Sequence, residues 1–298
     1  RFNLFDKRQH CFRAAAKVGL HGRTLFFAHG VELRQRLFDD GQDIVRQLLL
    51  VLLLLLHDED VGHAGQGGDG NIIAHAVIGG DEKMRHGVVL AKSPSAKKYG
   101  IMTGEPLSHA RQKCPELVVV PPDHELYAAS SRKFIEILEE VAPVIEQCSI
   151  DEAFCDMTGT EKLYGDPIAF ATKLKDRIYK ELGFTVNIGI STNKLLAKMA
   201  GELEKPNKCI TLFPEEIETK FWPLPIEDLF MVGRRTAPRL RKMGIRTVGE
   251  LAAYPPLLLE KEFKSFGKLL HAYANGIDDS PVAPSVSENK SIGNSTTM

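Results

Sequence analysis

From Ala76 to Trp222 the chain alternates short apolar runs with longer segments in which apolar residues recur every three or four positions. Runs of the first kind predict β-strands, and segments of the second kind predict amphipathic helices. The predicted strands are 76–78, 87–91, 117–120, 185–190 and 209–213. The predicted helices are 93–99, 106–114, 126–141, 167–182, 193–204 and 215–222. Their alternation indicates an α/β (α+β) fold in which helices pack on a mixed β-sheet.

Two of these helices allow more specific predictions. In the helix over 167–182, three apolar residues share one face, which is therefore predicted to be buried. Ser191 is predicted to cap the helix over 193–204, because a serine hydroxyl can accept a hydrogen bond from the free N–H groups of a first helical turn. The residues of the predicted buried face are Ala171, Leu174 and Ile178.

Beyond Pro225 the sequence becomes helical and basic. Between Leu229 and Leu270 it holds nine Lys and Arg residues against three Glu. Gly233 is predicted to form a tight turn between two helices, where free backbone N–H groups can bind a phosphate. Arg234 and Arg235 add positive charge at the same point. The pattern favours binding of the DNA backbone, with an ordinary helical hairpin as the alternative.

Residues 1–75 differ in composition from the rest of the chain. They hold seven Arg and two Lys, whereas residues 76–298 hold nine Arg and twenty Lys. Apart from the apolar run Leu48–Leu56, which is too short to span a bilayer, they show little periodicity. We therefore expect this segment to be poorly ordered or non-native, and of a different origin from residues 76–298.

The remaining composition points to an intracellular protein without a disulfide framework. The five cysteines are scattered and odd in number, as expected in the reducing cytoplasm. No secretory signal is found, so no membrane association is expected. The His and Asp residues between His57 and His63 could form a metal cluster, but their spacing is more typical of a solvated polar loop. The net charge of −1 gives no overall basic field that would indicate a nucleic-acid partner, so the charge of each region has to be considered separately.

Two adjacent carboxylates, Asp151 and Glu152, interrupt an apolar stretch. The runs on both sides, 144–150 and 153–157, are short enough to be strands. Adjacent side chains of a regular strand point to opposite faces, so the two acids can share a ligand only where the backbone turns. We therefore predict a tight hairpin with the pair at its tip, which suits a hard divalent ion such as Mg2+ that itself clamps phosphates. The alternative is an exposed acidic turn.

Three lysines follow on one predicted helix. Lys194 and Lys198 are four residues apart and so share a face, and Lys205 lies at the end of the same helix. We expect the preceding strand, Val186–Ile190, to pair with the acid hairpin and to bring these cations towards it. Carboxylates that hold a metal and lysines that contact phosphates are the groups that phosphoryl transfer requires. A solvated basic helix face is the alternative.

Three motifs in this order and spacing form a specific pattern. They are Ser149-Ile150-Asp151-Glu152-Ala153-Phe154, the segment Gly189–Ala200, and Lys205-Pro206-Asn207. With them, the stretch from about Ala76 to Met298, about three quarters of the chain, resembles the Y-family translesion DNA polymerases of the bacterial DNA polymerase IV (DinB) and UmuC-like kind.

The resemblance implies a three-part fold and a reaction. Residues 76–225 would form a UmuC-like palm with a small fingers insertion at about 80–121, residues 226–283 a helix-hairpin-helix thumb, and residues 284–298 the start of a little-finger domain. The implied reaction is template-directed nucleotidyl transfer in translesion synthesis and DNA repair. The implied partners are primer-template DNA, deoxynucleoside triphosphates and, through the little-finger side of the family's fold, a sliding clamp.

The resemblance also assigns roles to residues of the palm and fingers. Asp151 and Glu152 match the family's catalytic acids, which hold two Mg2+ ions, and Glu152 would also lie near the primer 3′ end. Lys205 matches a lysine that contacts the incoming triphosphate. Lys97 falls where the family often has a triphosphate-contacting Arg, and Lys198 is assigned to nucleotide binding with them.

The thumb and fingers match the family less closely in places. Gly233, Arg234 and Arg235 match the DNA-binding helix-hairpin-helix of the thumb. Met231, however, stands where a first Gly is usual. Pro94 stands where many members have a Tyr, which leaves the contacts of the fingers less defined.

The start of the family's fold is not recognised here. Its first strand carries an Asp-x-Asp-x-Phe-Phe-like motif, which supplies the remaining metal-binding Asp and an aromatic residue that excludes ribonucleotides. In residues 1–75, Asp6 lies too far from the palm segment, and Asp58 and Asp60 lie too close to it. We therefore expect the palm sheet to lack a strand and to expose an edge, a place that Leu48–Leu56 could occupy.

These departures predict a chain that binds DNA without extending a primer. The metal site would lack one carboxylate, and the little finger would stop soon after Lys290. The alternative function is a non-catalytic damaged-DNA-binding module that retains the thumb and palm. A diguanylate cyclase is a weaker rival, because Gly79-Gly80-Asp81-Glu82 resembles the hairpin motif of that family, but Lys83 replaces its Phe and no later feature supports it.

Overall fold

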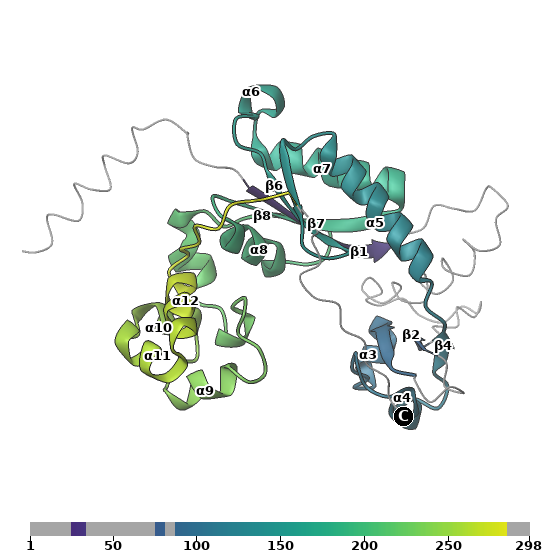
Figure 1. The fold of residues 1–298 in the computed structure, drawn as a ribbon. Coiled ribbons are helices and arrows are strands. Elements are labelled where there is room, and N and C mark those ends of the chain that lie inside the picture. The colour runs from purple at the N-terminus through teal and green to yellow at the C-terminus, as the bar shows by residue number, and fades with distance from the viewer. Residues whose placement is uncertain (1–24, 34–74, 81–86, 285–298) are drawn as a thin grey trace, which may run out of the picture.

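The computed structural model describes residues 25–33, 75–80 and 87–284, which form three parts (Figure 1). We use the names that the resemblance implies for these parts: palm for the five-stranded sheet with helices on both faces, fingers for the three-stranded sheet with two short helices, and thumb for the group of short helices. The metal cluster considered near His57, the strand considered at Leu48–Leu56 and the predicted start of the little finger lie outside the described residues.

Five strands form the palm sheet: β1 (Leu25–Leu33), β5 (Val144–Gln147), β6 (Glu152–Asp156), β7 (Phe184–Ser191) and β8 (Cys209–Thr211). Their order across the sheet is β5-β6-β1-β7-β8. β5 and β6 form a hairpin, β1 runs antiparallel to both β6 and β7, and β8 runs parallel to β7. The mixed sheet agrees with the predicted fold class.

β1 corrects the expectation that the palm sheet lacks a strand and exposes an edge. It lies inside the sheet, and Phe27 is the register partner of Phe154 on one side and of Gly189 on the other. Its first residues, Leu25-Phe26-Phe27-Ala28, are of the apolar and aromatic kind that favours strands. β1 also separates β7 from the acid hairpin, so the predicted direct pairing of Val186–Ile190 with that hairpin is wrong.

Helices cover both faces of the palm sheet. They are α5 (His124–Glu139), α6 (Glu161–Tyr164), α7 (Pro167–Leu182) and α8 (Lys194–Leu203). α5 and α7 pack on one face and α8 on the other (Figure 1). The division follows the two-residue repeat of β7, because Val186, Ile188 and Ile190 are buried with α5 and α7 while Gly189 lies against α8. The α7 residues predicted to be buried are buried: Ala171, Leu174 and Ile178.

The capping residue of α8 differs from the predicted one by two positions. Asn193, not Ser191, caps the helix, and its Oδ1 accepts a hydrogen bond from the Leu196 N–H at 2.8 Å. Ser191 still belongs to β7, and its hydroxyl donates to the Leu212 carbonyl oxygen. The strand therefore continues to Ser191 before the chain turns into the helix.

The fingers are built from five short elements: β2 (Ala76–Gly79), β3 (Val89–Lys92), α3 (Pro94–Lys98), α4 (Leu107–Lys113) and β4 (Val118–Val120). They lie at the predicted positions, and the strand order is β3-β2-β4. The Ser93 hydroxyl caps α3 by accepting from the Ala96 N–H at 3.0 Å, and it also accepts from the Ala76 N–H at 3.1 Å. This hydroxyl ties α3 to β2, over a core that includes Val77 and Leu107.

The thumb group begins before the predicted boundary at residue 226, because Ile217 and Phe221 are buried in the same cluster as its helices. Its elements are 3-10 turns at Pro214–Glu216 and Ile226–Asp228, a π turn at Ile217–Phe221, α9 (Ala237–Lys242), α10 (Val248–Ala253), α11 (Pro256–Phe263) and α12 (Ser265–Ala274). The single helix predicted over 215–222 is thus two different turns. At its start the Glu216 carboxylate accepts a hydrogen bond from the Phe213 N–H at 2.8 Å. No helix in the described part of the chain is long and apolar enough to cross a membrane.

The thumb packs on the palm through α8. Leu196 and Met199 of α8 belong to the same buried cluster as Phe221 and Leu270 of the thumb. After α12, residues 277–284, here called the strap, leave the thumb and run back over the palm beside α8 (Figure 1).

Candidate active site

The acid pair lies at the end of the β5–β6 hairpin, as predicted. Asp151 belongs to the connecting turn, and Glu152 is the first residue of β6. The Cys148 N–H donates to the Glu152 carbonyl oxygen at 2.9 Å, which closes the turn. The Ser149 hydroxyl donates to the Asp151 carboxylate at 2.7 Å. In a straight strand the two adjacent side chains would point to opposite faces. The turn removes this constraint, because the backbone changes direction between the two strands.

Two polar side chains hold the tip of the hairpin against α5. The Ser131 hydroxyl, on α5, donates to the Ile150 carbonyl oxygen. Gln147 Nε2 donates to Ser131 Oγ at 3.2 Å and to the Ser149 carbonyl oxygen at 3.0 Å. Sequence reasoning missed both residues, because a serine in an amphipathic helix and a glutamine at a strand end are common and carry no separate signal.

α8 places two lysines on the face of the hairpin. Lys198 Nζ lies 3.1 and 3.2 Å from the carboxylate oxygens of Glu152. Lys194 Nζ lies 2.7 and 2.8 Å from those of Glu146 on β5, and 5.0 Å from the ring centroid of Phe154. The lysines thus reach the hairpin from a helix above the sheet, although β7 itself is not its neighbour. Glu146 is a contact that the sequence pattern did not suggest.

The other two predicted nucleotide-binding lysines lie elsewhere. Lys205 follows α8 and forms an ion pair with Glu202 at 2.7 Å, with both side chains more than a third exposed. Lys97 is exposed on α3 of the fingers. The structure therefore brings Lys198 to the acid pair and leaves Lys205 and Lys97 at separate, exposed positions.

The strand beside the acid pair carries no aspartate. The register between β1 and β6 puts His29 opposite Glu152, and the acidic residue of β1 is Glu32. The described residues contain no group of three or more His, Cys, Asp or Glu residues that could hold a metal ion. The third carboxylate that the resemblance implies is therefore not identified in this part of the chain.

The thiols of the hairpin are poor candidates for ligands or nucleophiles at neutral pH, since both roles require the thiolate. Burial raises the pKa of Cys155, in the middle of β6, to about 12. The side chain of Cys148 is partly exposed, but the protein around its sulfur and the nearby Glu146 carboxylate raise its pKa as well. Both groups stay protonated near pH 7.

The thumb hairpin bends at a different residue from the one predicted. Met231, not Gly233, has a left-handed backbone, with φ of 72°. Gly233 does not have a positive φ, and a Cβ built there would meet nothing within 4 Å. The prediction that Gly233 is the residue that permits the tight turn is therefore wrong. The conformation that favours glycine falls on Met231, where the resemblance implies a glycine.

The two arginines predicted to contact DNA are exposed next to this turn. Neither Arg234 nor Arg235 forms an ion pair within the described part of the chain. Two arginines of α9, by contrast, are neutralised by acidic residues of the thumb. These pairs are Arg239–Glu262 and Arg241–Glu227. The hairpin turn therefore carries two exposed positive charges that no acidic residue of the described chain pairs with.

Replacing Met231 by Gly should stabilise the fold slightly. A left-handed backbone costs a residue with a Cβ about 1–2 kcal/mol, which glycine would avoid. Glycine also makes the unfolded chain more flexible, which costs roughly 0.5–1 kcal/mol of stability, so the net gain is about 0.5–1 kcal/mol. The midpoint of thermal unfolding should rise by roughly 1–4 °C. Met231→Ala is the control, because it removes the same half-exposed side chain but keeps the Cβ. An equal rise in both variants would contradict strain at this residue.

Models of known protein families match most of the described chain. Residues 73–202 match the model of the impB/mucB/samB family, and residues 214–245 match the model of the IMS family HHH motif. The first match covers the acid hairpin, α8 and the fingers, and the second covers the thumb hairpin. Nothing in these matches supports the cyclase alternative.

Curated relatives match about three quarters of the chain. A DNA polymerase IV of Clostridium acetobutylicum is 53% identical over 224 residues, which are 75% of this chain and 56% of that protein. A DNA polymerase IV of Moorella thermoacetica is 44% identical over 224 residues, which are 74% of this chain and 56% of that protein. The chain thus spans a little over half the length of the curated relatives that it matches.

Solved structures share the fold. A Y-family DNA polymerase chimera superposes with a TM-score of 0.70 at 24% identity, covering 89% of this chain and 70% of the other. DinB from Sulfolobus solfataricus superposes with a TM-score of 0.68 at 24% identity, covering 87% of this chain and 69% of the other. The two family models and the relatives thus show that much of the chain is similar to the impB/mucB/samB family and to proteins named DNA polymerase IV, and the solved structures show the same fold.

Proposed function

We propose that this chain contains the palm, fingers and thumb of a DNA-directed DNA polymerase that acts in translesion synthesis and DNA repair. The observation that carries the proposal is the acid hairpin, with Asp151 and Glu152 at its tip and Lys198 at the Glu152 carboxylate. The relatives named DNA polymerase IV support nucleotidyl transfer as the reaction class. The proposed partners are primer-template DNA, deoxynucleoside triphosphates and a sliding clamp.

Asp151 and Glu152 would hold Mg2+. Their donor set fits this ion, which proteins commonly bind through one or two carboxylates while substrate phosphates and water complete the shell. When bound, two such ions would activate the primer 3′-oxygen and stabilise the pyrophosphate leaving group. The turn at Asp151 and the hydrogen bond from Ser149 orient one of the two carboxylates for this task.

The three lysines would contact the triphosphate. Lys198 supplies positive charge within 3.1 Å of Glu152, where the reacting phosphate would approach the acid pair. Lys205 is exposed and paired with a neighbouring carboxylate, a partner that a phosphate can replace. Lys97 would reach the triphosphate from the fingers. Such cations act by neutralising the charge that develops on the transferred phosphoryl group.

Primer extension and DNA binding on one preparation test the proposal. The expectation of binding without extension rested partly on a missing palm strand, and β1 removes that ground. A second ground, the carboxylate that the metal site would lack, still stands, because β1 carries no aspartate. The third ground, the short little finger, lies outside the described residues. Template-dependent incorporation with Mg2+ would support the polymerase. Binding of duplex without incorporation would instead favour a non-catalytic DNA-binding module.

Replacing Arg234 and Arg235 together by Ala should weaken DNA binding about equally for unrelated duplexes. Their exposed charges would contact phosphates, which position a duplex but carry no sequence information. Each lost contact should lower the slope of log affinity against log salt by about one, or roughly two for the pair. Fluorescence anisotropy across a salt titration measures both quantities.

The matched control for this pair removes two exposed lysines of α7, Lys173 and Lys180, as alanine substitutions. The control changes the net charge equally but lies outside the thumb, so its affinity should stay near that of the parent. A loss confined to one DNA sequence, or an equal loss in the control, would contradict the thumb assignment.

A further inference from the structure

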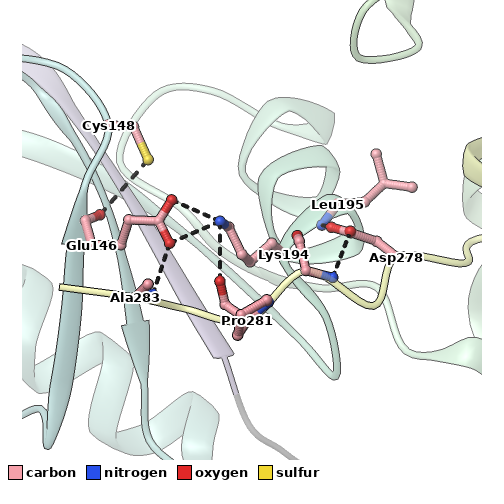
Figure 2. A network of polar contacts seen from close by, with 8 residues as sticks. Glu146, Cys148, Lys194, Leu195, Asp278, Pro281 and Ala283 are labelled. Carbon is pink, nitrogen blue, oxygen red and sulfur yellow. Dashed lines mark hydrogen bonds and ion pairs between the residues drawn. The ribbon is translucent and has the colours of Figure 1, made fainter. Parts of the chain in front are cut away.

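The strap is tied to the start of α8 at its thumb end. Just before it, the Gly276 carbonyl oxygen accepts a hydrogen bond from Asn193 Nδ2 at 2.8 Å. One Asp278 carboxylate oxygen then accepts from the Leu195 N–H at 3.1 Å (Figure 2). A carboxylate in this position satisfies a free N–H of the first helical turn and interacts favourably with the helix dipole. The strap therefore begins as an extension of the cap of α8.

Farther along, the strap is bound by an ion pair between two residues on different elements of the palm. Glu146 on β5 and Lys194 on α8 bind each other at 2.7 Å. The Ala283 N–H donates to the Glu146 carboxylate at 2.9 Å, and Lys194 Nζ donates to the Pro281 carbonyl oxygen at 3.4 Å (Figure 2). Each member of the pair thus also binds a main-chain group of the strap.

An apolar contact lies between these polar ones. Val282 packs against Phe154 on β6 and Ala197 on α8. Phe154 is the register partner of Glu146, and it lies two residues after Glu152 on the same face of the sheet. The strap therefore covers the face of the hairpin that also presents Glu152 to Lys198.

We propose that Glu146 and Lys194 are positioning residues for the acid pair, because they clamp the strap over the hairpin and so hold Glu152 in place against Lys198. The inference rests on the proposed function. Lys194 and Lys198 are four residues apart on one helix, and they engage carboxylates on the two neighbouring strands of the hairpin. With the strap docked, Phe154 is covered and the hairpin is held against α8.

An ion pair of this exposure would contribute little by itself. The Lys194 and Glu146 side chains are 15% and 24% exposed, and ion pairs that water reaches commonly stabilise a fold only slightly. Its importance here lies in the two main-chain groups that it also satisfies. Breaking the pair should therefore release the strap more than it unfolds the palm.

The first test follows the strap directly by amide hydrogen exchange in the full chain. In Lys194→Met and in Glu146→Ala, exchange at Ala283 and Leu195 should become roughly tenfold faster, as the loss of hydrogen bonds to charged groups predicts. Lys194→Arg keeps the charge and donors and should restore slow exchange. Arg177→Met is the control, because it breaks exposed ion pairs on the outer helices and should leave both amides unchanged.

The second test follows the acid pair. Mn2+, used as a probe in place of Mg2+, should bind roughly tenfold more weakly to Lys194→Met and to Glu146→Ala, as measured by electron paramagnetic resonance. In primer extension, kcat should fall about tenfold while KM for the nucleotide stays within about twofold, since the clamp holds an acid and not the triphosphate. Lys194→Arg should recover both values.

Three outcomes would overturn the inference. Unchanged exchange at Ala283 and Leu195 would mean that the ion pair does not hold the strap. Faster exchange with unchanged Mn2+ affinity would mean that the strap does not position the acids. A parent protein that binds Mn2+ but does not extend primers would count against the proposed function, and its Mn2+ comparison would still decide this inference. A parent that binds no Mn2+ would overturn both.

Discussion

In a preparation that extends primers, replacing Asp151 by Ala should reduce extension by roughly a thousandfold, because a carboxylate that holds Mg2+, the role proposed for Asp151, accounts for several kcal/mol of transition-state stabilisation. The affinity for a primer-template duplex should stay within about twofold of the parent, since the proposed phosphate contacts lie in the thumb. Asp151 lies in a turn, where its carboxylate is bound by the Ser149 hydroxyl and packs in no core cluster. The substitution should therefore leave the palm folded.

Extension of a primer by one nucleotide and anisotropy on the same preparation measure these two effects. Mn2+ binding is a third readout, which does not depend on turnover. Glu139→Ala is the matched control, because it removes an exposed carboxylate of α5. Extension by Asp151→Ala at the parent rate would show that the metal assignment is wrong. A large loss of duplex affinity would show that Asp151 supports the fold instead.

Gly189→Ala should destabilise the palm severely. A Cβ at position 189 would lie 1.9 Å from the Ala197 carbonyl oxygen and 2.4 Å from the Gly201 nitrogen. Both are backbone atoms of α8, so no side-chain rotation can relieve the overlap, and the helix must move away from β7. Overpacking of this kind costs about 3 kcal/mol or more. The midpoint of thermal unfolding should fall by roughly 6–12 °C, or the protein should fail to fold.

The same experiment has an internal control. Gly233→Ala places a Cβ where nothing lies within 4 Å and where φ is not positive, so it should change the unfolding midpoint by no more than roughly 2 °C. Circular dichroism measures both variants. If Gly189→Ala were as stable as the parent, the close approach of α8 to β7 would be contradicted, and with it the position of Lys198 over the acid pair.

The regular parts of the fold follow from the sequence. Helix α7 matches its predicted bounds because the signals agree: Asp166 caps it, Gly183 ends it with φ of 78°, and its apolar residues repeat at helical spacing. The acid hairpin is predictable for a physical reason, since Asp151 and Glu152 can act together only at a turn. The sequence also predicts that Lys198 lies near the acids. The reason given for it, pairing of Val186–Ile190 with the acid hairpin, is wrong.

Other features depend on contacts that no local pattern encodes. Glu146 is an ordinary polar residue of a half-exposed strand until Lys194 and the strap are placed around it. The bend at Met231 could have been suspected, because the resemblance implies a glycine there, but a departure from a family pattern does not by itself predict a backbone angle. Leu25–Ala28 has the composition of a strand, yet its composition does not reveal which strands it joins.

The central place of β1 has a consequence for the order in which the chain folds. β1 ends at Leu33, but its two partners begin at Glu152 and Phe184, so its pairings require the closure of long loops. Such closure costs chain entropy and slows folding. The β5–β6 hairpin and the β7–α8–β8 unit need only local contacts. We expect these two units to form first and β1 to dock between them last. Glu152 on the hairpin and Lys198 on α8 would then come into contact only in this final step.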